Sequence, residues 1–432
     1  MSEARTARGD GREVCVIGAG IVGCASAVAL SQAGWCVTLV DAQATPGLGE
    51  SRANGAQLSY SYVEPLATPA ALRALPGWLL AADSPLRWRP RTDWAHWRWL
   101  LQFVAACRWS QVSATTEALL ALSGLSRQVL HRWLAQWPTI APATQHARPG
   151  KLVLYRDAAA RPAVERQIGW QRAWGCEQQI IGADECRRLE PALAASGGGP
   201  IAFAVWTESE EVVDAALLAQ ALARASGATL RLGERALRFE RGRAEGGEAR
   251  ISALHTEAGR IEADAFVLAA GPAVRALLQP LGWAPPVEPI RGYSITLPVH
   301  QPSMAPKVSV TDAARKLVYA RLGDRLRVAG FAELCGSDRS LDPRRIEALC
   351  RAVRETFDGA CSFDDPQPWV GLRPATPGGR PIIGATRWPG LWLNAGHGAL
   401  GLTLACGSAD LLTSMMSGQK APIDPAPYRL PG

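Results

Sequence analysis

The sequence lacks the patterns that mark a disulfide scaffold, a metalloprotein or a membrane-spanning protein. Its ten cysteines form no Cys-x-x-Cys pair, and several, such as Cys15 and Cys406, lie inside apolar runs. This usage indicates reduced, buried thiols. The six histidines show no metal-ligand spacing, so no metal site is predicted. No run approaches the ~18 consecutive apolar residues of a membrane span.

A leader and a concentrated charge are also missing. Residues 1–12 are polar and contain no apolar core, so no secretory signal is expected and the protein is predicted to be cytoplasmic. The net charge is +7, but the basic residues are dispersed, and codon usage explains the excess of arginine over lysine equally well. We therefore predict no nucleic-acid partner from the charge.

What the sequence does contain is a glycine-rich turn near its N-terminus. The apolar run 14–17 leads into Gly18-Ala19-Gly20-Ile21-Val22-Gly23, and a helix of small residues is expected to follow. The first glycine permits a tight turn, the second lets the backbone approach a diphosphate, and the third lets the helix pack on the strand. The next strand ends in Asp41, whose carboxylate suits a ribose hydroxyl. A bound dinucleotide is predicted here; the alternative is a turn that serves packing alone.

A tryptophan-rich segment follows. Eight of the sixteen tryptophans fall within residues 70–137, the first of them Trp78. Their spacing predicts an amphipathic helix over 92–104, and a second long helix is expected over 114–137. Two interpretations stay open: a helical subdomain with bulky core residues, or an aromatic surface that contacts a membrane interface.

The order of the remaining elements argues against two domains in tandem. Strands that end in small residues recur at 264–271 and after 391, whereas strands of mixed length fill 291–330. We expect an α/β fold with a discontinuous Rossmann-type domain, and a second α+β substrate domain of mixed antiparallel sheet and helices. The first is predicted to comprise residues 12–77, 208–283 and 370–432, and the second residues 78–207 and 284–369, including the tryptophan-rich segment.

Taken together, these stretches resemble the FAD-dependent D-amino acid oxidase-like superfamily, most of all the bacterial D-amino acid dehydrogenase small-subunit group. The likeness covers nearly the whole chain and implies FAD, a split cofactor domain and oxidation of an amine beside a carboxylate. It is carried by the glycine motif with Asp41, Glu50–Tyr60, Asp264–Gly271, Gly292-Tyr293-Ser294, Leu322–Gly330, Gly371–Pro377, Gly384-Ala385-Thr386, Asn394–Gly398 and Ala405–Ser408.

The cofactor loop departs from the family pattern. Glu50 occupies the usual Thr position and Arg52 the usual Phe position. A carboxylate near the diphosphate would repel it unless Arg52 or another cation compensates. Hydroxyl contacts from this loop are therefore expected from Ser51 alone.

The resemblance implies a set of cofactor-binding residues, in which the backbone N–H groups at the start of the last helix favour negative charge on reduced flavin. The set is Gly18, Gly20, Ile21, Val22, Gly23, Asp41, Ala42, Ser51, Asn54, Gly55, Gln57, Leu58, Ala236, Leu237, Ala270, Gly271, Gly396, His397, Gly398, Leu400 and Gly401.

The candidate substrate-binding residues surround one arginine. Arg373, in Gly-Leu-Arg-Pro, matches the family's carboxylate-binding arginine; its alternative is a surface salt bridge. Tyr293 and Tyr319 are expected to close the carboxylate site with their hydroxyl groups, or else to pack in the core. Tyr60 and Tyr62 alternate along the chain and are placed on one face near the amine. His397 is expected beside the flavin, without a role as a base.

These residues predict oxidative deamination of D-amino acids, or of cyclic imino acids such as D-proline derivatives. The hydride would pass from Cα to flavin N5, giving an imine and then a 2-oxo acid and ammonia, with electrons handed to a quinone-type acceptor. The alternatives are an oxygen-using oxidase of glycine, sarcosine or other N-substituted amino acids, and an FAD-holding electron-transfer subunit. A tRNA-modifying relative is less favoured, because no methyltransferase region is visible. Contact with the inner face of the cytoplasmic membrane, and with other subunits, stays open.

Overall fold

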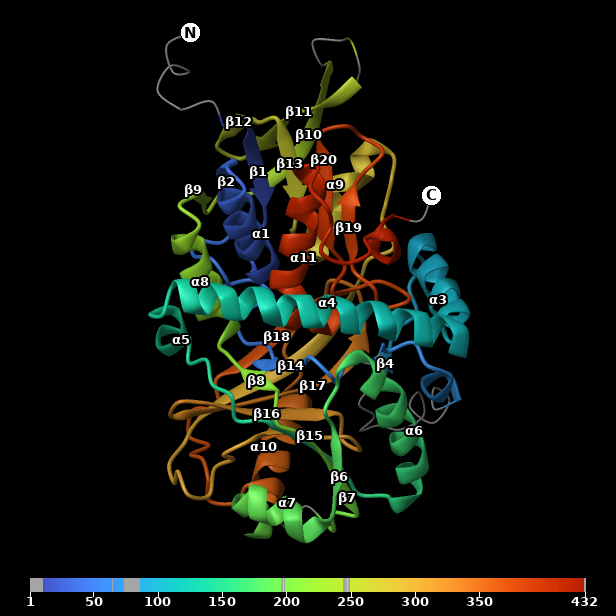
Figure 1. Ribbon diagram of the computed structural model, residues 1–432, viewed down its shortest axis with the longest axis vertical. Helices are drawn as coiled ribbons and strands as arrows, with labels where there is room; N and C mark the ends of the chain where they lie inside the picture. The colour runs from blue at the N-terminus through green and yellow to red at the C-terminus, as the bar shows by residue number, and fades with distance from the viewer. Residues whose placement is uncertain are drawn as a thin grey trace.

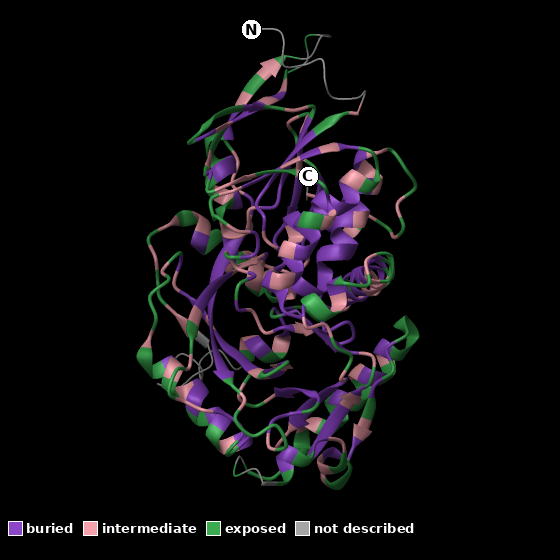
Figure 2. Cartoon of the chain, turned by 90° about the vertical axis from the view of Figure 1, so that its left-hand side faces the viewer, coloured by how far each residue is buried: buried purple, intermediate pink, exposed green. Residues whose placement is uncertain are grey.

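Two β-sheets follow one another along the long axis of the molecule (Figure 1). The structure is a computed structural model and describes residues 11–63, 65–73, 86–195, 197, 199–243, 247 and 249–430. The expectation for Trp78 lies outside the described residues. Buried segments form the interior of both halves, and exposed residues cover their outer loops and helices (Figure 2).

The first sheet has six strands in the order β19-β20-β13-β1-β2-β9. All pairs in it are parallel except β19–β20. Its strands come from three separate parts of the chain, which confirms the discontinuous Rossmann-type fold. Their bounds are Glu13–Ile17 (β1), Cys36–Asp41 (β2), Thr229–Leu232 (β9), Ala265–Leu268 (β13), Ile382–Ala385 (β19) and Leu391–Ala395 (β20).

Helices and a small sheet cover the two faces of this sheet. On one face lie α1 (Ile21–Gln32), α8 (Ala215–Ala225) and α11 (Gly401–Met416), which share a buried apolar core with β1 and β2. The other face packs against an antiparallel sheet of β10, β11 and β12 and against α9. Their bounds are Ala236–Arg243 (β10), Ala249–Thr256 (β11), Gly259–Glu262 (β12) and Val274–Leu278 (α9).

The second sheet is mixed, in the order β18-β14-β17-β16-β15-β5-β7-β6, with β4 beside β17. Its pairs are antiparallel except β15–β5 and β17–β4. The strands are Leu86–Trp88 (β4), Lys151–Tyr155 (β5), Gln179–Ile181 (β6), Phe203–Thr207 (β7), Glu288–Pro298 (β14), Ser309–Asp312 (β15), Leu317–Leu322 (β16), Arg325–Leu334 (β17) and Pro368–Ala375 (β18). Helix α10 (Pro343–Thr356) packs on this sheet and contributes Leu349 and Val353 to its core.

The remaining elements connect the two halves. Strands β3 and β8 form a two-stranded sheet between them. Helix α4 crosses the front of the molecule in Figure 1, with α3 at one end and α5 at the other. The bounds are Gln57–Leu58 (β3), Glu211–Val212 (β8), Trp94–Ala106 (α3), Trp109–Gln136 (α4), Ile140–Ala143 (α5), Arg161–Gln171 (α6) and Ala183–Leu189 (α7).

Two predicted domain boundaries are wrong. Helix α4 was assigned to the substrate domain, but Leu119, Leu122 and Trp133 enter the core formed by α1 and α11. The two helices approach closely because Gly407 of α11 has no side chain: a Cβ there would lie 2.6 Å from the Leu122 carbonyl oxygen. The predicted boundary at residue 370 falls inside β18, which pairs with β14 in the second sheet.

One segment, Gly398–Met416, is long and apolar enough to cross a membrane by length and composition. Within the protein it contains α11, and 67% of it is buried. Leu404, Leu411 and Leu412 are fully buried in the core shared with α1 and α4. Its apolar character is accounted for by this packing.

Candidate functional site

A cavity of about 920 Å³ runs between the two sheets, from the glycine turn to β18. Its volume lies within the range of ~300–1,000 Å³ typical of ligand sites. All the predicted cofactor residues line it except Gly23 and Leu58. Of the predicted substrate residues, Arg373, Tyr293, Tyr62 and His397 line the cavity, and Tyr60 and Tyr319 do not.

The glycine turn has the geometry that a diphosphate requires. Gly18 has φ +107°, and a Cβ there would lie 2.5 Å from the Ala269 carbonyl oxygen. A Cβ at Gly23 would overlap the Gly18 carbonyl, so this glycine serves the packing of α1 on β1 rather than contact with a ligand. A Cβ at Gly20 would meet only Ser51 Oγ, at 3.5 Å. The space over Gly20 therefore belongs to the cavity.

The N-terminus of α1 is open toward this space. The helix has no side-chain cap from its own N-cap residue, Gly20, and no acidic residue in its first turn. Instead the Ile21 N–H donates to Ser51 Oγ over 3.0 Å. The Ser51 hydroxyl proton stays available for an anion, and the partial positive charge of the helix terminus favours one.

Asp41 closes the end of β2 at the cavity wall. Its two oxygens accept hydrogen bonds from the N–H groups of Ala19 (2.6 Å) and Gln43 (2.7 Å). These bonds fix the carboxylate beside the glycine turn, and each carboxylate oxygen keeps further acceptor capacity for ribose hydroxyl groups.

Of the two alternatives that the sequence left open for Glu50, Arg52 or another cation, the structure has the second. The Glu50 carboxylate pairs with Arg339 and accepts a hydrogen bond of 2.5 Å from the Leu372 N–H. Arg52 is exposed and does not line the cavity. The balancing cation therefore comes from the loop after β17, which lies far from Glu50 in the sequence.

The far end of the cavity also fits a flavin nucleotide. The start of α11 contributes Gly401, Leu402 and Thr403 to the wall, so that its backbone N–H groups lie at the cavity. Asn394 at the end of β20 donates to Ser26 Oγ over 3.0 Å, but its Oδ1 atom is buried with no partner in the described part of the chain. A bound group with a donor would satisfy this oxygen. The residues present fit a dinucleotide that extends from the glycine turn to α11.

Arg373 is partly buried beside this end of the cavity. Its guanidinium lies against Gly292, where a Cβ would overlap it, and its Nη1 donates to the Phe331 carbonyl over 2.6 Å. In the described part of the chain it forms no ion pair, and burial lowers its pKa to about 10. The group is still a cation at neutral pH, and its unused N–H groups suit a carboxylate.

The tyrosines are arranged differently from the predictions. Tyr62 lies in the cavity wall, but Tyr60 turns to the other side, where its hydroxyl donates to Glu211 over 3.1 Å. Tyr319 is buried in the core of the second sheet against Phe357, because the cavity-facing residue of β16 is its neighbour Val318. Tyr293 is among the residues that line the cavity, but its ring packs in the core of the second sheet against Phe331, and its hydroxyl donates to Glu333 over 3.0 Å. Its hydroxyl therefore points to the protein rather than to a substrate carboxylate.

His397 is buried in the cavity wall just before α11. Burial lowers its pKa to about 3, so the ring is neutral at physiological pH. Its Nε2 lies 3.2 Å from Ser408 Oγ, and that hydroxyl donates to the Ala405 carbonyl. His397 thus links the turn to the first part of α11.

Several cavity residues were missed by the sequence reasoning. Trp99 and Phe103 reach the cavity from α3, so the tryptophan-rich segment contributes to the site. Lys151 and Ser59 line it together and are hydrogen bonded over 2.7 Å. The sequence contained a signal for Lys151, because this lysine begins the apolar run Lys151–Tyr155. A lysine is rarely buried unless its charge has a partner or a function.

Comparison with known proteins shows what the chain is similar to. The family model described as FAD dependent oxidoreductase matches residues 13–415. D-amino acid dehydrogenase 2 from Ralstonia nicotianae is 47% identical over 430 residues, which is 97% of this chain and 99% of that protein. D-amino acid dehydrogenase 2 from Pseudomonas aeruginosa is 43% identical over 417 residues, or 96% of this chain and 97% of that protein.

Solved structures show the same fold at lower identity. Glycine oxidase from Geobacillus kaustophilus aligns with a TM-score of 0.74 at 20% identity, over 97% of this chain and 99% of that one. Iminodiacetate oxidase from a Chelativorans species aligns with a TM-score of 0.70 at 24% identity, over 96% and 98%. With the glycine turn, Asp41 and the start of α11 on one cavity, the match over residues 13–415 has a structural basis: the chain belongs to the DAO family of FAD-dependent oxidoreductases.

Proposed function

We propose that this protein oxidises D-amino acids, or cyclic imino acids of the same configuration, and passes the electrons to a quinone-type acceptor. The observation that carries the proposal is the partly buried side chain of Arg373, which has no ion-pair partner in the described residues and lines the cavity that fits FAD. Relatives named D-amino acid dehydrogenase, up to 47% identical over nearly the full length, support the substrate class.

Different residues of the cavity bind the substrate and limit the access of water. Arg373 binds the substrate carboxylate through two parallel N–H groups and so fixes the position of Cα. Trp99, Phe103 and Trp369 are among the residues that line the cavity, and their apolar character limits the access of water to it. When bound, FAD supplies the acceptor for the hydride that leaves Cα. The imine product hydrolyses in water to a 2-oxo acid and ammonia.

The test is an anaerobic substrate panel on the holoprotein. D-amino acids, D-proline, their L-enantiomers, glycine and sarcosine are mixed separately with the enzyme, and bleaching of the flavin is followed. We expect D-amino acids to bleach it fastest. Preferential bleaching by glycine or sarcosine would favour the oxidase alternative, and no bleaching by any compound would favour an FAD-holding electron-transfer subunit.

The electron acceptor is tested separately by reoxidation. The reduced protein is mixed with air-saturated buffer or with a soluble quinone in a stopped-flow instrument. We expect the quinone to reoxidise the flavin much faster than oxygen does. Rapid reoxidation by oxygen would contradict the dehydrogenase assignment.

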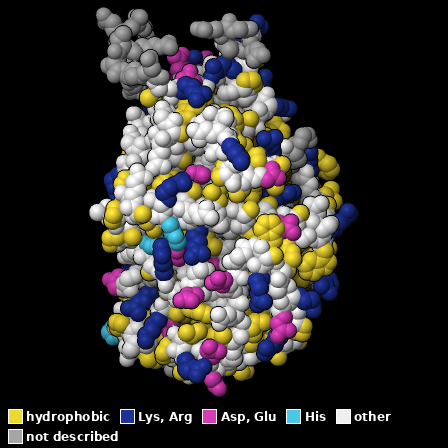
Figure 3. All heavy atoms as spheres, viewed as in Figure 1, with side chains coloured by type: hydrophobic (Ala, Val, Ile, Leu, Met, Phe, Trp, Pro, Cys, Tyr) yellow, Lys and Arg dark blue, Asp and Glu magenta, His cyan; other side chains and the backbone are white. Residues whose placement is uncertain are grey.

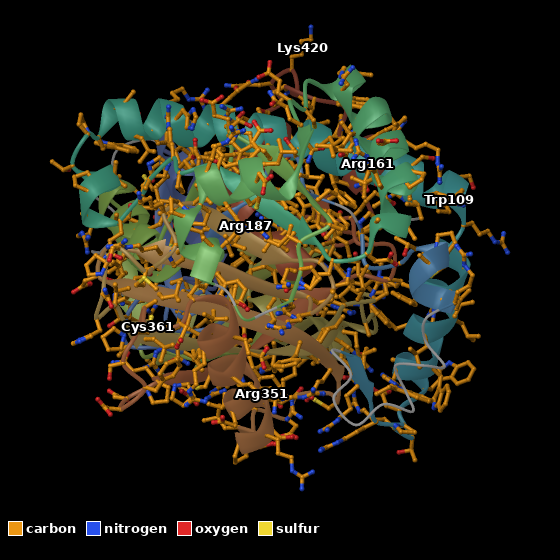
Figure 4. The ribbon with its side chains drawn as sticks, turned by 90° about the horizontal axis from the view of Figure 1, so that it is seen from below. Trp109, Arg161, Arg187, Arg351, Cys361 and Lys420 are labelled. Carbon is orange, nitrogen blue, oxygen red and sulfur yellow. The ribbon has the colours of Figure 1, made fainter. Side chains whose placement is uncertain are left out.

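We also propose that the protein lies in the cytoplasm and contacts the inner face of the membrane through α3. Trp94, Leu101 and Trp109 are 73%, 66% and 70% exposed, and lie on or next to this helix. Hydrophobic side chains gather on the α3 side of the molecule in Figure 3, and Trp109 lies at the periphery in Figure 4. Exposed tryptophan suits the membrane interface, where a quinone would be encountered.

Flotation with liposomes tests the contact. Replacing Trp94, Leu101 and Trp109 by serine should abolish co-flotation with vesicles that contain anionic lipid. The matched control is Trp174→Ser, which removes a tryptophan that is 46% exposed elsewhere on the surface. Failure of the wild-type protein to float would contradict the membrane contact and leave the catalytic proposal intact.

A further inference from the structure

A buried lysine lines the cavity, and the proposed binding of FAD and substrate does not involve it. Lys151 begins β5 and is 2% exposed, and it lines the cavity with Ser59 and Tyr62. A lysine is almost never fully buried unless it is paired, because removing its charge from water is costly. Its position therefore calls for a functional explanation.

In the described residues, no carboxylate forms an ion pair with Lys151. Its Nζ is hydrogen bonded to Ser59 Oγ over 2.7 Å and lies 4.5 Å from the centre of the Tyr62 ring. No paired anion therefore holds it in the charged form, and the neutral amine has a lone pair that can accept a proton. Ser59 in turn connects to the start of α11, because its N–H donates to Thr403 Oγ1 over 3.1 Å.

One charged group faces this lysine from the neighbouring elements. Burial lowers the pKa of Lys151 to about 8, and the carboxyl group of Glu210 opposes that shift. The residues paired with Lys151 in β7 and β15, Thr207 and Ser309, are uncharged. Glu210 itself is fully buried; burial raises its pKa, and Lys151 opposes the rise.

Glu210 has an unsatisfied oxygen. Its Oε1 accepts a hydrogen bond of 2.8 Å from the Ser61 N–H, but its Oε2 has no partner in the described residues. Ser309 Oγ, next to Lys151 in the sheet register, is likewise buried without a partner in them. Glu210 Oε2 and Ser309 Oγ therefore leave hydrogen-bonding capacity near a buried amine, which suits a water molecule or a proton in transfer.

The proposed reaction has a use for such a group. An amino acid enters mainly as an ammonium ion, whereas loss of a hydride from Cα is assisted by the nitrogen lone pair. A proton must therefore leave the nitrogen while the substrate is bound in the cavity. A base whose pKa is near the working pH is suited to this task.

We infer that Lys151 is the acceptor of the proton that the substrate ammonium gives up, with Ser59 as the link and Glu210 as the balancing charge. The inference rests on the proposed function. The ammonium N–H bond breaks and its electron pair stays on nitrogen as the lone pair. The Ser59 hydroxyl takes that proton and passes its own to Nζ, so that one N–H bond forms and nothing is oxidised or reduced.

Titratable side chains surround the residue that follows Glu210 in the chain. Glu211 follows Glu210 in the chain and is bound by His131 Nε2 over 2.6 Å and His146 Nε2 over 2.9 Å. His131 is partly exposed, and histidine atoms appear on the face of the molecule shown in Figure 3, beside acidic and basic side chains. Lys151 can return its proton through this side between turnovers.

The first experiment measures protonation without turnover. The chain has only four lysines, so ¹³Cε-lysine labelling of the holoprotein gives four resonances. The Lys151 resonance is the one that persists when Lys307, Lys316 and Lys420, all exposed, are replaced by arginine. We expect it to titrate well below the other three. If the Lys151 resonance titrates at the same pH as the resonances of the exposed lysines, the inference is wrong.

The second experiment compares pH profiles of anaerobic flavin bleaching by a D-amino acid. Lys151→Met removes the base and Lys151→Arg keeps a charge that does not titrate, while Ser59→Ala removes the link. Each should slow bleaching about 10²-fold at neutral pH, the usual size of a general-base effect. The loss should shrink at high pH, where the substrate amine loses its proton unaided.

The matched control is Lys420→Met, which removes a lysine that projects into solvent at the surface (Figure 4). It should keep the wild-type profile. Unchanged profiles in both Lys151 variants, or an equal loss at every pH, would overturn the inference and assign Lys151 a structural role. Failure of the wild-type protein to bleach with any amino acid would instead refute the proposed function, so the two failures are distinguishable.

Discussion

Arg373 is a cation whose local partners are backbone rather than carboxylates. Its side chain donates to the Phe331 carbonyl, and burial lowers its pKa to about 10, so the protein bears the cost of holding a charge away from water. An ion pair within the protein would offset this desolvation cost before any ligand binds. For an arginine that binds a ligand carboxylate, the cost is offset only when the ligand is bound.

Replacing Arg373 by methionine should therefore impair substrate binding far more than folding. The loss of a buried charge pair with the substrate carboxylate is worth about 2–5 kcal/mol, so kcat/KM should fall at least about 30-fold. Steady-state kinetics with a quinone-type dye would measure the fall. Flavin content and the unfolding midpoint serve as controls. An unchanged KM would show that Arg373 does not bind the substrate.

Ser51 is the hydroxyl that the cofactor loop offers to the diphosphate. Ser51→Ala removes the acceptor of the Ile21 N–H and a donor to the ligand. One lost hydrogen bond to a charged group costs about 1.5–3 kcal/mol, so the affinity for FAD should drop at least about 10-fold. Titration of the apoprotein with FAD, followed by quenching of flavin fluorescence, would measure it. Equal affinity in both proteins would show that the backbone alone binds the diphosphate.

At the scale of single residues, the sequence indicated which residue types matter but not always which way they face. Arg373, Tyr62 and the glycine turn line the cavity as expected. Tyr60 and Tyr62 were placed on one face because they alternate, but the chain leaves β3 irregularly and sends them apart. Arg339 could not be assigned to Glu50 from the sequence, since only the fold brings the two loops together.

At the scale of elements, the contact between α1 and β1 depends on one missing side chain. Gly23→Ala would drive a methyl group into the Gly18 carbonyl and displace the turn. We expect loss of FAD binding and a drop in stability of about 1–3 kcal/mol from overpacking, measured by urea unfolding.

The matched control for this substitution lies in α4. Gly124 is also inside a helix, but a Cβ there would meet nothing within 4 Å. Gly124→Ala should therefore leave FAD binding unchanged and raise stability by up to about 1 kcal/mol, because alanine is the better helix former. Equal behaviour of the two variants would contradict the packing role of Gly23.

Two helices carry a start signal that can be read in the sequence, an aspartate at the N-cap position. Asp214 caps α8 through the N–H groups of Ala216 and Leu217, and Asp342 caps α10 through that of Arg344. The sequence did not indicate that α4 packs against α1 and α11. An apolar stripe shows that a helix face is buried, but not which sheet or helix covers it.

At the scale of the whole molecule, a buried carboxylate joins the second sheet to α10. Burial acts to raise the pKa of Glu333, but hydrogen bonds from Arg291 and Arg345 outweigh it and hold the pKa below its ordinary value of 4.5. A carboxyl group whose pKa is lowered by folding stabilises the protein above that ordinary value, and the stabilisation is lost as the pH falls below it.

Glu333→Gln should therefore destabilise the protein at neutral pH by about 3–5 kcal/mol, since it removes the charge partner of Arg345 and leaves Arg291 with Asp338 alone. The difference from the wild type should shrink as the pH falls below 4.5. Urea unfolding at a series of pH values would measure it. A difference that stays constant with pH would show that the packing of the side chain matters and its charge does not.

The interleaved order of the first sheet has a consequence for protein synthesis. β1 and β2 leave the ribosome before β13, and β13, which lies beside β1, takes its other neighbour from residues 391–395, which are made much later. The wall that α11 adds to the cavity is made later still. FAD can therefore be enclosed only after β20 and α11 have joined strands that precede them by more than 100 residues in the case of β13 and by more than 300 in the case of β1. We expect a chain cut short upstream of β20 to retain no flavin, because it lacks both the second neighbour of β13 and that wall.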